Sequence, residues 1–113
     1  MHELSLMEGL REQVLAAAAQ HGARSIAAVH LRIGSLAGVE PQALQMAFTL
    51  LMAEGIGAGA RLEIEAVAAE WFCGRCAAAF ADGPAGCECP RCGSFSRRLL
   101  RGRELELAAL EID

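Results

Sequence analysis

Two short stretches, Cys73-Gly-Arg-Cys76 and Cys89-Pro-Arg-Cys92, stand twelve residues apart and decide how this chain of 113 residues is organised. Each Cys-x2-Cys pair turns tightly enough to direct two thiolates at one point, and two such pairs at this separation are typical of structural zinc sites. Four thiolates close a tetrahedral shell and leave no position for water, so the site is expected to be structural rather than catalytic. The sequence therefore predicts that the four cysteines bind one zinc ion.

Two further interpretations of the cysteines remain open. A Cys-x2-Cys pair can also form a redox-active disulfide, although two matched pairs in a strand-rich context favour a metal. The fifth cysteine, Cys87, stands two residues before Cys89 and could compete with it as a ligand. We expect Cys87 to be a spare thiol beside the site.

The bulk composition argues against several classes of protein. The net charge is −4 and the isoelectric point is about 5.3, so the chain has no overall positive field for nucleic acid. The N-terminus lacks the pattern of a signal peptide, and the most apolar stretch, 43–53, is too short to span a bilayer. We therefore expect a cytoplasmic protein without a membrane partner, in which thiols stay reduced.

The hydrophobic pattern on both sides of the cysteines predicts helices and strands. Two upstream segments repeat apolar residues at helical spacing, and two others alternate as half-buried strands do. A third strand follows the cysteines. In chain order, the expected elements are helix 5–21, strand 25–33, helix 41–54, strand 60–66 and strand 104–112.

The boundaries of the two helices have recognisable signals. Ser5 and Glu8 match a capping box, so the first helix is expected to begin at Ser5. Pro41 is typical of a first helical residue, which makes Glu40 the N-cap of the second helix.

Two of the strands allow a more detailed prediction. Along 104–112 the apolar phase slips by one residue near Ala108 and Ala109, so we expect a bulge or a bend there. The strand over 25–33 alternates strictly, which separates two faces. Val29, Leu31 and Ile33 are expected on one face, and Ala28, His30 and Arg32 on the other.

Together these elements predict an α+β fold. A three-stranded sheet with two helices makes a small two-layer domain, and its last strand can join the sheet only if the chain returns after the cysteines. The cysteine segment is then an inserted zinc-ribbon-like module rather than a tail. We assign 1–70 plus 103–113 to the α/β domain and 71–102 to the zinc-binding module.

Arginines concentrate in the cysteine segment. Between Trp71 and Arg103 there are six arginines, against two acids, Asp82 and Glu88. They could offset the charge of the thiolates while staying solvated, or they could form a docking face for an acidic partner. The sequence leaves both interpretations open.

The amino end, Met1-His2-Glu3, holds a second group of potential ligands. The terminal amine, the amide nitrogen of His2 and its imidazole can close adjacent chelate rings around one ion. Nitrogen donors in one plane suit Ni(II) or Cu(II). Glu3 and Glu40 could add carboxylate oxygens if the loop before the second helix lies near the amino end. These are ordinary residues, so alone they do not establish a metal site.

The order of these motifs resembles the HypA/HybF family of hydrogenase maturation nickel metallochaperones, over nearly the whole chain. A pair of zinc knuckles is common, whereas its combination with a Met-His-Glu start is specific. The matching stretches are Met1-His2-Glu3, 21–26 and 29–36, Val39-Glu40, the two knuckles, and the Leu-Glu-Leu and Leu-Glu-Ile-Asp segments of 105–113.

The resemblance implies nickel held at the amino end by His2 with backbone nitrogens of the first residues, including Met1. Residues matching Glu3 and Glu40 would help to hold or deliver the ion, and the four knuckle cysteines would bind structural zinc. Position 40 is an aspartate in some members of the family and a glutamate here, and Cys87 lies outside the family pattern.

The resemblance also implies partners. These are a HypB-type GTPase, the large subunit of [NiFe]-hydrogenase, and in some organisms urease maturation proteins. The alternative function is a zinc-ribbon interaction or nucleic-acid-binding module, which the acidic charge and the few aromatic residues oppose. We find no nucleophile beside a base and no paired catalytic carboxylates, so an enzyme is not expected.

Overall fold

The computed structural model describes residues 2–113, which form two compact units. The helical unit contains the N-terminal residues to Arg32 together with Val39–Glu65 and Glu106–Asp113. The cysteine unit contains Ile33–Gly38 and Ala66–Leu105. The boundaries assigned from the sequence, 1–70 plus 103–113 and 71–102, remain a prediction about which parts fold independently.

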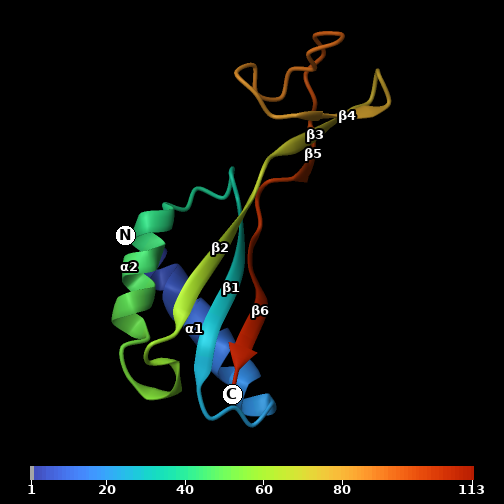
Figure 1. Ribbon diagram of the computed structural model, residues 1–113. Coiled ribbons are helices and arrows are strands. Elements are labelled where there is room, and N and C mark those ends of the chain that lie inside the picture. Colours follow the sequence, from blue (N-terminus) through green and yellow to red (C-terminus); the bar gives the residue numbers. More distant parts are fainter. Residues whose placement is uncertain (1) are drawn as a thin grey trace. The chain divides into compact units, whose positions relative to one another are not determined.

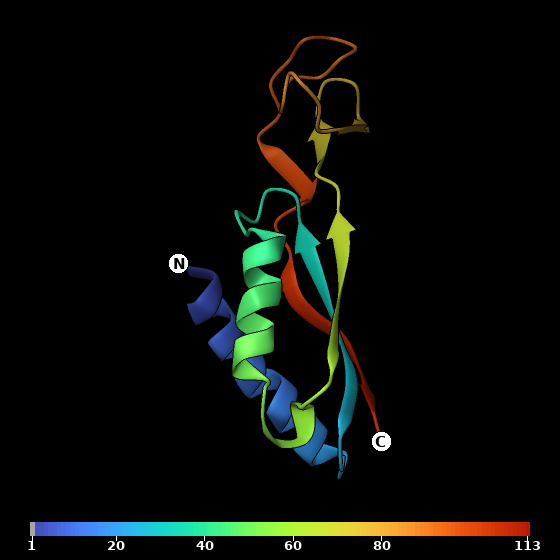
Figure 2. The same cartoon turned by 60° about the vertical axis from the view of Figure 1, so that its left-hand side comes forward.

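The helical unit packs two helices on one face of a three-stranded sheet. The sheet has the order β2-β1-β6, and Figure 2 shows β1 and β2 pointing the same way, with β6 opposite and both helices on one side. The elements are α1 (His2–Gln20), β1 (Ile26–Gly34), α2 (Pro41–Leu51), a short 3-10 helix (Gly55–Gly57), β2 (Arg61–Val67) and β6 (Leu105–Ile112).

The core of the helical unit lies between the helices and the sheet. α1 buries a stripe at helical spacing, and α2 buries Leu44, Ala47 and Phe48 against it. A surface helix of a globular protein typically buries one such stripe. The buried residues of α1 are Glu3, Met7, Leu10, Val14 and Ala18.

The cysteine unit has a sheet of its own, which Figure 1 shows at β3, β4 and β5. β3 (Glu70–Cys73) lies between β4 (Ala78–Ala81) and β5 (Arg98–Arg101) and pairs with both in the antiparallel sense. These three short strands were not predicted individually. Two helices, a three-stranded sheet and an inserted cysteine unit nevertheless confirm the predicted α+β class.

The predicted start of the first helix is wrong. α1 begins at His2 rather than Ser5, so Ser5 lies inside the helix and does not cap it. Glu3 lies in the first turn, where a carboxylate interacts favourably with the positive end of the helix dipole. The local capping signal at Ser5 and Glu8 is therefore overridden by residues that extend the helix toward the amino end.

The second helix begins as predicted and ends earlier than predicted. Glu40 is the N-cap, and its side chain accepts a hydrogen bond from the Gln42 amide at 3.2 Å. The helix ends at Leu51 rather than Glu54. The carbonyl of Leu51 accepts a hydrogen bond from Nε of Arg11 at 3.1 Å, which satisfies one of the carbonyls left over at a helix end.

Both β1 and β6 change phase. In β6, the more exposed positions become adjacent at Ala108 and Ala109, where the sequence predicted the slip. In β1, Ala28 is fully buried although strict alternation assigned it to the opposite face, and burial changes phase between Ala28 and Val29. The shift by one residue that the sequence predicted for β6 is therefore accompanied by a similar shift in the burial pattern of its neighbour β1.

Hydrogen bonds at the two ends of this strand pair support the match. The Gly34 amide donates to the Glu104 carbonyl at 2.8 Å, and the Asp113 amide donates to the Ser25 carbonyl at 3.0 Å. The same number of residues separates the two bonds along each strand, so neither strand has a net insertion. None of the helices in the part of the chain that the structure describes has the length and hydrophobicity of a membrane span.

Three backbone segments of the cysteine unit converge at Gly34. The Ser35 amide donates to the Val67 carbonyl at 2.9 Å, and the Leu36 amide donates to the Gly102 carbonyl at 2.7 Å. A Cβ atom at Gly34 would overlap the backbone of Gly102, so only glycine allows this approach.

The crossing at Gly34 predicts a stability difference between two glycine substitutions. Gly34→Ala should destabilise the protein by about 1–3 kcal/mol, because backbone must move to admit the methyl group. Gly9→Ala is the matched control, since Gly9 lies in α1 with open space around its Cβ position. It should stabilise by up to about 1 kcal/mol through helix propensity. Urea unfolding measures both, and a Gly34→Ala protein as stable as wild type would contradict the close approach.

Candidate metal centres

The four knuckle cysteines come together in the cysteine unit. Their sulfur atoms all lie within 4.8 Å of one another, an arrangement that could hold a metal ion. The Sγ atoms of Cys73 and Cys92 are 3.6 Å apart, and those of Cys76 and Cys89 are 4.0 Å apart. Zn–S bonds of about 2.3 Å would place the sulfurs of a regular tetrahedron about 3.8 Å apart. The spacing therefore fits a zinc-sized shell, while the identity of the ion remains a prediction.

Local backbone turns direct each pair of cysteines inward. In the first knuckle, the Cys76 amide donates to Sγ of Cys73 at 3.4 Å. In the second, the Gly93 amide donates to the Cys89 carbonyl at 2.8 Å, and Gly93 has a positive φ of 76°. A glycine adopts this conformation without the steric cost that a Cβ would bring. Each knuckle is thus a tight turn that its own hydrogen bonds hold.

The pKa values of the Cys76 and Cys92 thiols are shifted in opposite directions. Hydrogen bonds from Ser94 lower the pKa of Cys92 to about 6. The neighbouring Cys92 sulfur instead raises the pKa of Cys76 to about 12, with burial as the next cause. Without a bound cation, the cluster therefore favours a thiolate at Cys92 beside a protonated thiol at Cys76. A bound metal would displace the remaining protons, so its affinity should weaken in acid.

The structure keeps Cys87 outside the cluster. Among the described residues, the group close enough to share an ion comprises Cys73, Cys76, Cys89 and Cys92 only. The Cys87 carbonyl accepts a hydrogen bond from the Ser96 amide at 2.8 Å, which holds this part of the chain by its backbone. This position supports the interpretation of Cys87 as a spare thiol.

The arginines of the cysteine unit are all exposed. Arg101 lies 3.4 Å from Glu70, and the guanidinium of Arg98 lies 5.1 Å from the ring centre of Phe72, within range of a cation–π interaction. Phe95 is 72 % exposed on the same unit. The solvated arginines and the exposed ring leave the docking interpretation open.

At the amino end, the structure brings together His2, Glu3 and the backbone of Glu40. His2 is the first residue of α1, and its side chain is 57 % exposed. Its Nε2 atom lies 3.5 Å from Oε2 of Glu3. The same Glu3 oxygen accepts a hydrogen bond from the Glu40 amide at 3.0 Å. The loop before α2 therefore does lie near the amino end, which was the condition for Glu40 to contribute.

Glu3 and Glu40 have different roles in this arrangement. Glu3 is buried, at 6 % exposure, and its carboxylate bridges the first turn of α1 to the start of α2. The Glu40 carboxylate caps α2 through the Gln42 amide. It is thus the backbone of Glu40 that meets Glu3. Met1, the other residue expected at this site, lies outside the described residues.

The Glu3 carboxylate remains ionised over the neutral range. Its pKa is lowered to about 2; the largest cause is the hydrogen bond from the Glu40 amide, and the charge of His2 is a smaller one. A carboxylate beside an imidazole is typical of metal sites, where it orients the ring or supplies an oxygen ligand. The sequence identified these residues, but not the hydrogen bond that joins them.

An apolar groove borders Glu3 on the surface of the two helices. It has a volume of about 430 Å³ and is lined by Leu4 and by one face of α2. On that face Met46 and Leu50 are 74 % and 68 % exposed, and α2 contains no charged residue. Exposed apolar surface of this kind often marks an interaction site.

Comparison with protein families gives one match over nearly the whole chain. The family described as "Hydrogenase/urease nickel incorporation, metallochaperone, hypA" matches residues 1–112. A hydrogenase maturation factor HypA from Roseiflexus sp. strain RS-1 is 42 % identical, over 100 % of this chain and 93 % of the relative. The protein of the same name from Chloroflexus aurantiacus is 46 % identical over 98 % of both chains.

Solved structures show the same fold. The solution structure of the Ni metallochaperone HypA from Helicobacter pylori has a TM-score of 0.70 at 24 % identity, and covers 99 % of this chain and 97 % of that one. A second solution structure of a HypA protein has a TM-score of 0.71 at 25 % identity, with coverage of 99 % and 96 %.

The four-cysteine centre predicts an asymmetric result for cysteine substitutions. Changing Cys73, Cys76, Cys89 or Cys92 to alanine should release the metal and loosen the cysteine unit, because binding supplies folding energy there. Cys87→Ala is the matched control and should retain one metal ion per chain. Elemental analysis of the purified proteins measures this. Stoichiometric zinc in Cys92→Ala, with Cys87 unreactive to a thiol probe, would show that Cys87 is a ligand.

Proposed function

Because the chain belongs to the HypA family of nickel-incorporation metallochaperones rather than to an enzyme family, we propose that it carries Ni(II) on His2 at its amino end. The client is the large subunit of a [NiFe]-hydrogenase. The family assignment implies hydrogenase maturation, and the contacts of His2 and Glu3 support the choice of site. The protein acts as a carrier, so it must release the ion as well as bind it.

The observation that carries this proposal is the hydrogen bond between the Glu3 carboxylate and the Glu40 amide. It fixes the first turn of α1 against α2, so the imidazole of His2 is held on an ordered element and not on a loose terminus. Preorganised donors lose less conformational entropy when they bind an ion. The imidazole itself stays exposed, which allows a client to reach the ion.

The donor set also fits nickel chemically. Imidazole and backbone nitrogens are borderline ligands that favour Ni(II) over Mg(II) or Ca(II), whereas Cu(II) should bind more tightly still. Selectivity for nickel must then come from availability and from the partner. Met1 would contribute its nitrogen, and Glu3 and Glu40 would contribute mainly by position.

Zinc has a separate, structural role in this proposal. Four sulfurs at tetrahedral spacing leave no open position, so the ion they hold is expected to stay with the protein. Its binding would stabilise a unit that has only short strands and few buried residues. We also place the protein in the cytoplasm, where reduced thiols can keep this ion.

Delivery requires a contact with other proteins. We propose a HypB-type GTPase as the partner that assists transfer, with urease maturation proteins as further partners. The apolar groove beside Glu3 supports contact near the nickel site, because a partner that covers Met46 and Leu50 would also approach His2 within the helical unit.

The proposed site predicts the loss of nickel binding on substitution of His2. His2→Ala should weaken Ni(II) binding by more than the roughly 10–100-fold that loss of an outer-shell partner costs. His21→Ala is the control, because His21 lies at the other end of α1 and is not part of the proposed site. Isothermal titration of the tag-free protein measures both. Unchanged affinity in His2→Ala, with the zinc content intact, would place the ion elsewhere.

Two substitutions of Glu3 separate positioning from direct ligation. Glu3→Gln keeps an oxygen that can accept from the Glu40 amide, whereas Glu3→Ala removes it. If Glu3 acts by positioning, Glu3→Ala should weaken nickel binding roughly 10–100-fold, and Glu3→Gln should stay close to wild type. The same titration decides. Equal losses in both variants would mean that the carboxylate charge itself contacts the nickel.

A further inference from the structure

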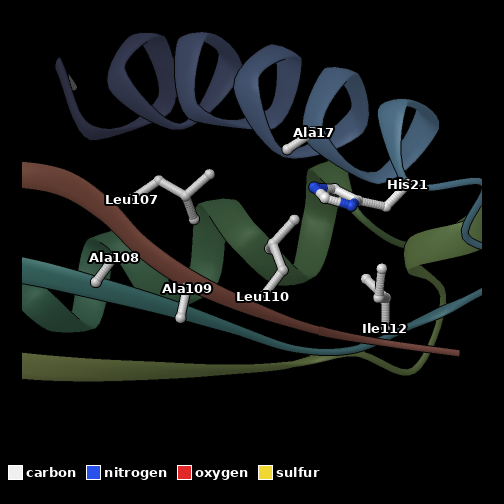
Figure 3. Close-up of a pocket in the computed structure, with 7 residues that line it drawn as sticks. All are labelled: Ala17, His21, Leu107, Ala108, Ala109, Leu110 and Ile112. Atoms are coloured by element: carbon white, nitrogen blue, oxygen red, sulfur yellow. The ribbon is translucent and has the colours of Figure 1, made fainter.

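Two surfaces of the protein have no part in the proposed function. One is an open groove of about 370 Å³ between α1 and β6, where Figure 3 shows Leu107, Leu110 and Ile112 pointing toward α1. Its lining is apolar apart from His21, so it offers no charge that would select one occupant over another. The other surface is the outer edge of β5 in the cysteine unit, where arginines do select by charge.

The edge strand β5 lies in the most basic segment of the chain. Four of the ten arginines fall between Arg97 and Arg103, and this segment contains no acidic residue. The chain has no lysine, and the planar guanidinium of arginine is the cation that best matches the two oxygens of a carboxylate. β5 has β3 on one side and no strand of the described chain on the other.

Arginines are used differently in the sheet of the helical unit. There, Arg32 and Arg61 each lie within 3.5 Å of two carboxylates of the same sheet. In the cysteine unit, by contrast, the described residues form a single ion pair, between Arg101 and Glu70 at 3.4 Å. Most of the positive charge at β5 is therefore left for another molecule.

The arginines at β5 also do not serve the four-cysteine centre. Among the described residues no arginine donates a hydrogen bond to a cysteine sulfur, whereas the Cys76 amide donates to Sγ of Cys73. Arg75 and Arg91 stand inside the two knuckles, and Arg91 lines a cavity together with Cys76 and Cys89. Offsetting the charge of the thiolates is thus a role that suits these two arginines rather than those of β5.

A bulge places two arginines on one face of β5. Arg98 is opposite Phe72 and Arg101 is opposite Glu70, so three steps along β5 match two along β3. Phe72 and Glu70 share a face of the sheet because they are two residues apart, and residues opposite each other on neighbouring strands also share a face. The contacts of Arg98 with Phe72 and of Arg101 with Glu70 agree with this placement. Bulges at sheet edges often redirect side chains in this way.

This arrangement suits carboxylates at alternate positions of an extended chain. Because of the bulge, Arg98 and Arg101 are separated by the length of two regular strand residues, about 7 Å. An extended segment beside β5 presents every second side chain to the same face at that spacing. Its backbone can also pair with the outward-facing amides and carbonyls of β5. A nucleic acid offers negative charge but no backbone that pairs with a strand, so the edge favours a peptide.

Glutamates at alternate positions also occur in this chain, but they already have partners. Glu63 and Glu65 lie within 3.5 Å of an arginine of their own sheet, and so does Glu106. The carboxylate of Glu104 accepts a hydrogen bond from the Gly102 amide at 2.8 Å. The acidic segment that fits β5 is therefore expected from a different protein.

We propose that the outer edge of β5 binds an extended segment of another protein, in which acidic residues alternate with uncharged ones and are held by Arg98 and Arg101. Leu100, the bulged residue, is 41 % exposed and adds an apolar contact between the two charges. When the edge is unoccupied, its charges and its bulge hinder pairing with other strands. This docking does not involve the nickel site, which belongs to the helical unit.

An NMR titration of the zinc-loaded, nickel-free full chain with capped peptides tests the proposal. The probe alternates glutamate and threonine over about seven residues, the length of 97–103. It should bind with chemical-shift changes confined to β5 and β3. A peptide with glutamine in place of glutamate should bind roughly tenfold more weakly, because it loses the ion pairs. A peptide of the same composition with its glutamates in one block should also bind more weakly, because its spacing does not match.

Two double substitutions locate the binding on the protein. Arg98→Gln together with Arg101→Gln should weaken binding of the probe roughly tenfold. Arg75→Gln together with Arg91→Gln is the matched control, since it removes the same charge from the same unit and should leave binding close to wild type. The zinc content of each protein checks that the cysteine unit is intact, and the comparison of peptides on wild type does not depend on either variant.

Three results would overturn the proposal. Equal binding of the glutamate and glutamine peptides, or equal losses in the two double variants, would show that β5 does not recognise alternating carboxylates. Tighter binding of a single-stranded oligothymidylate, lost in the variant of Arg98 and Arg101, would assign the edge to nucleic acid. Shifts at β5 that depend on protein concentration without any peptide would show that a second copy occupies the edge.

Discussion

The hydrogen bond from the Glu40 amide to the Glu3 carboxylate is the constraint on which the amino end depends. It joins the first turn of α1 to the residue that caps α2, so two helix starts share one ionised group. Without it, His2 would belong to a fraying terminus, where most short chains lose order. With it, an exposed imidazole is held in place beside a carboxylate, and the proposed carrier function follows from that combination of fixed position and open access.

The cysteine unit is stabilised in a different way from the amino end. Its strands are four residues long, and its arginines and Phe95 are exposed, so burial alone gives it little stability. Four sulfurs at the spacing of a tetrahedral shell supply the missing constraint. The two proposed ions therefore contribute in opposite ways. One would stabilise a fold and stay in it, and the other would be held at the surface for transfer.

The sequence predicted the features that depend on local chemistry, and it missed those that depend on distant contacts. The cysteine pairs, the Glu40 cap and the phase slip of β6 are signalled by residues close together in the chain. The predicted start of α1 was wrong because the capping box at Ser5 is a local signal. The hydrogen bond that holds Glu3 comes instead from the Glu40 amide, 37 residues away in the chain. The strands β3, β4 and β5 are too short for alternation to reveal, and the buried Ala28 reflects a phase change that β1 shares with β6.

X-ray absorption at the nickel and zinc edges of one sample loaded with both metals can distinguish the two proposed sites. Around nickel we expect nitrogen and oxygen neighbours, with the outer-shell scattering of an imidazole that disappears in His2→Ala. Around zinc we expect four sulfurs at about 2.3 Å. Sulfur in the nickel shell, or an imidazole signal that persists in His2→Ala, would contradict the separation of a nickel site at His2 from a structural four-cysteine centre.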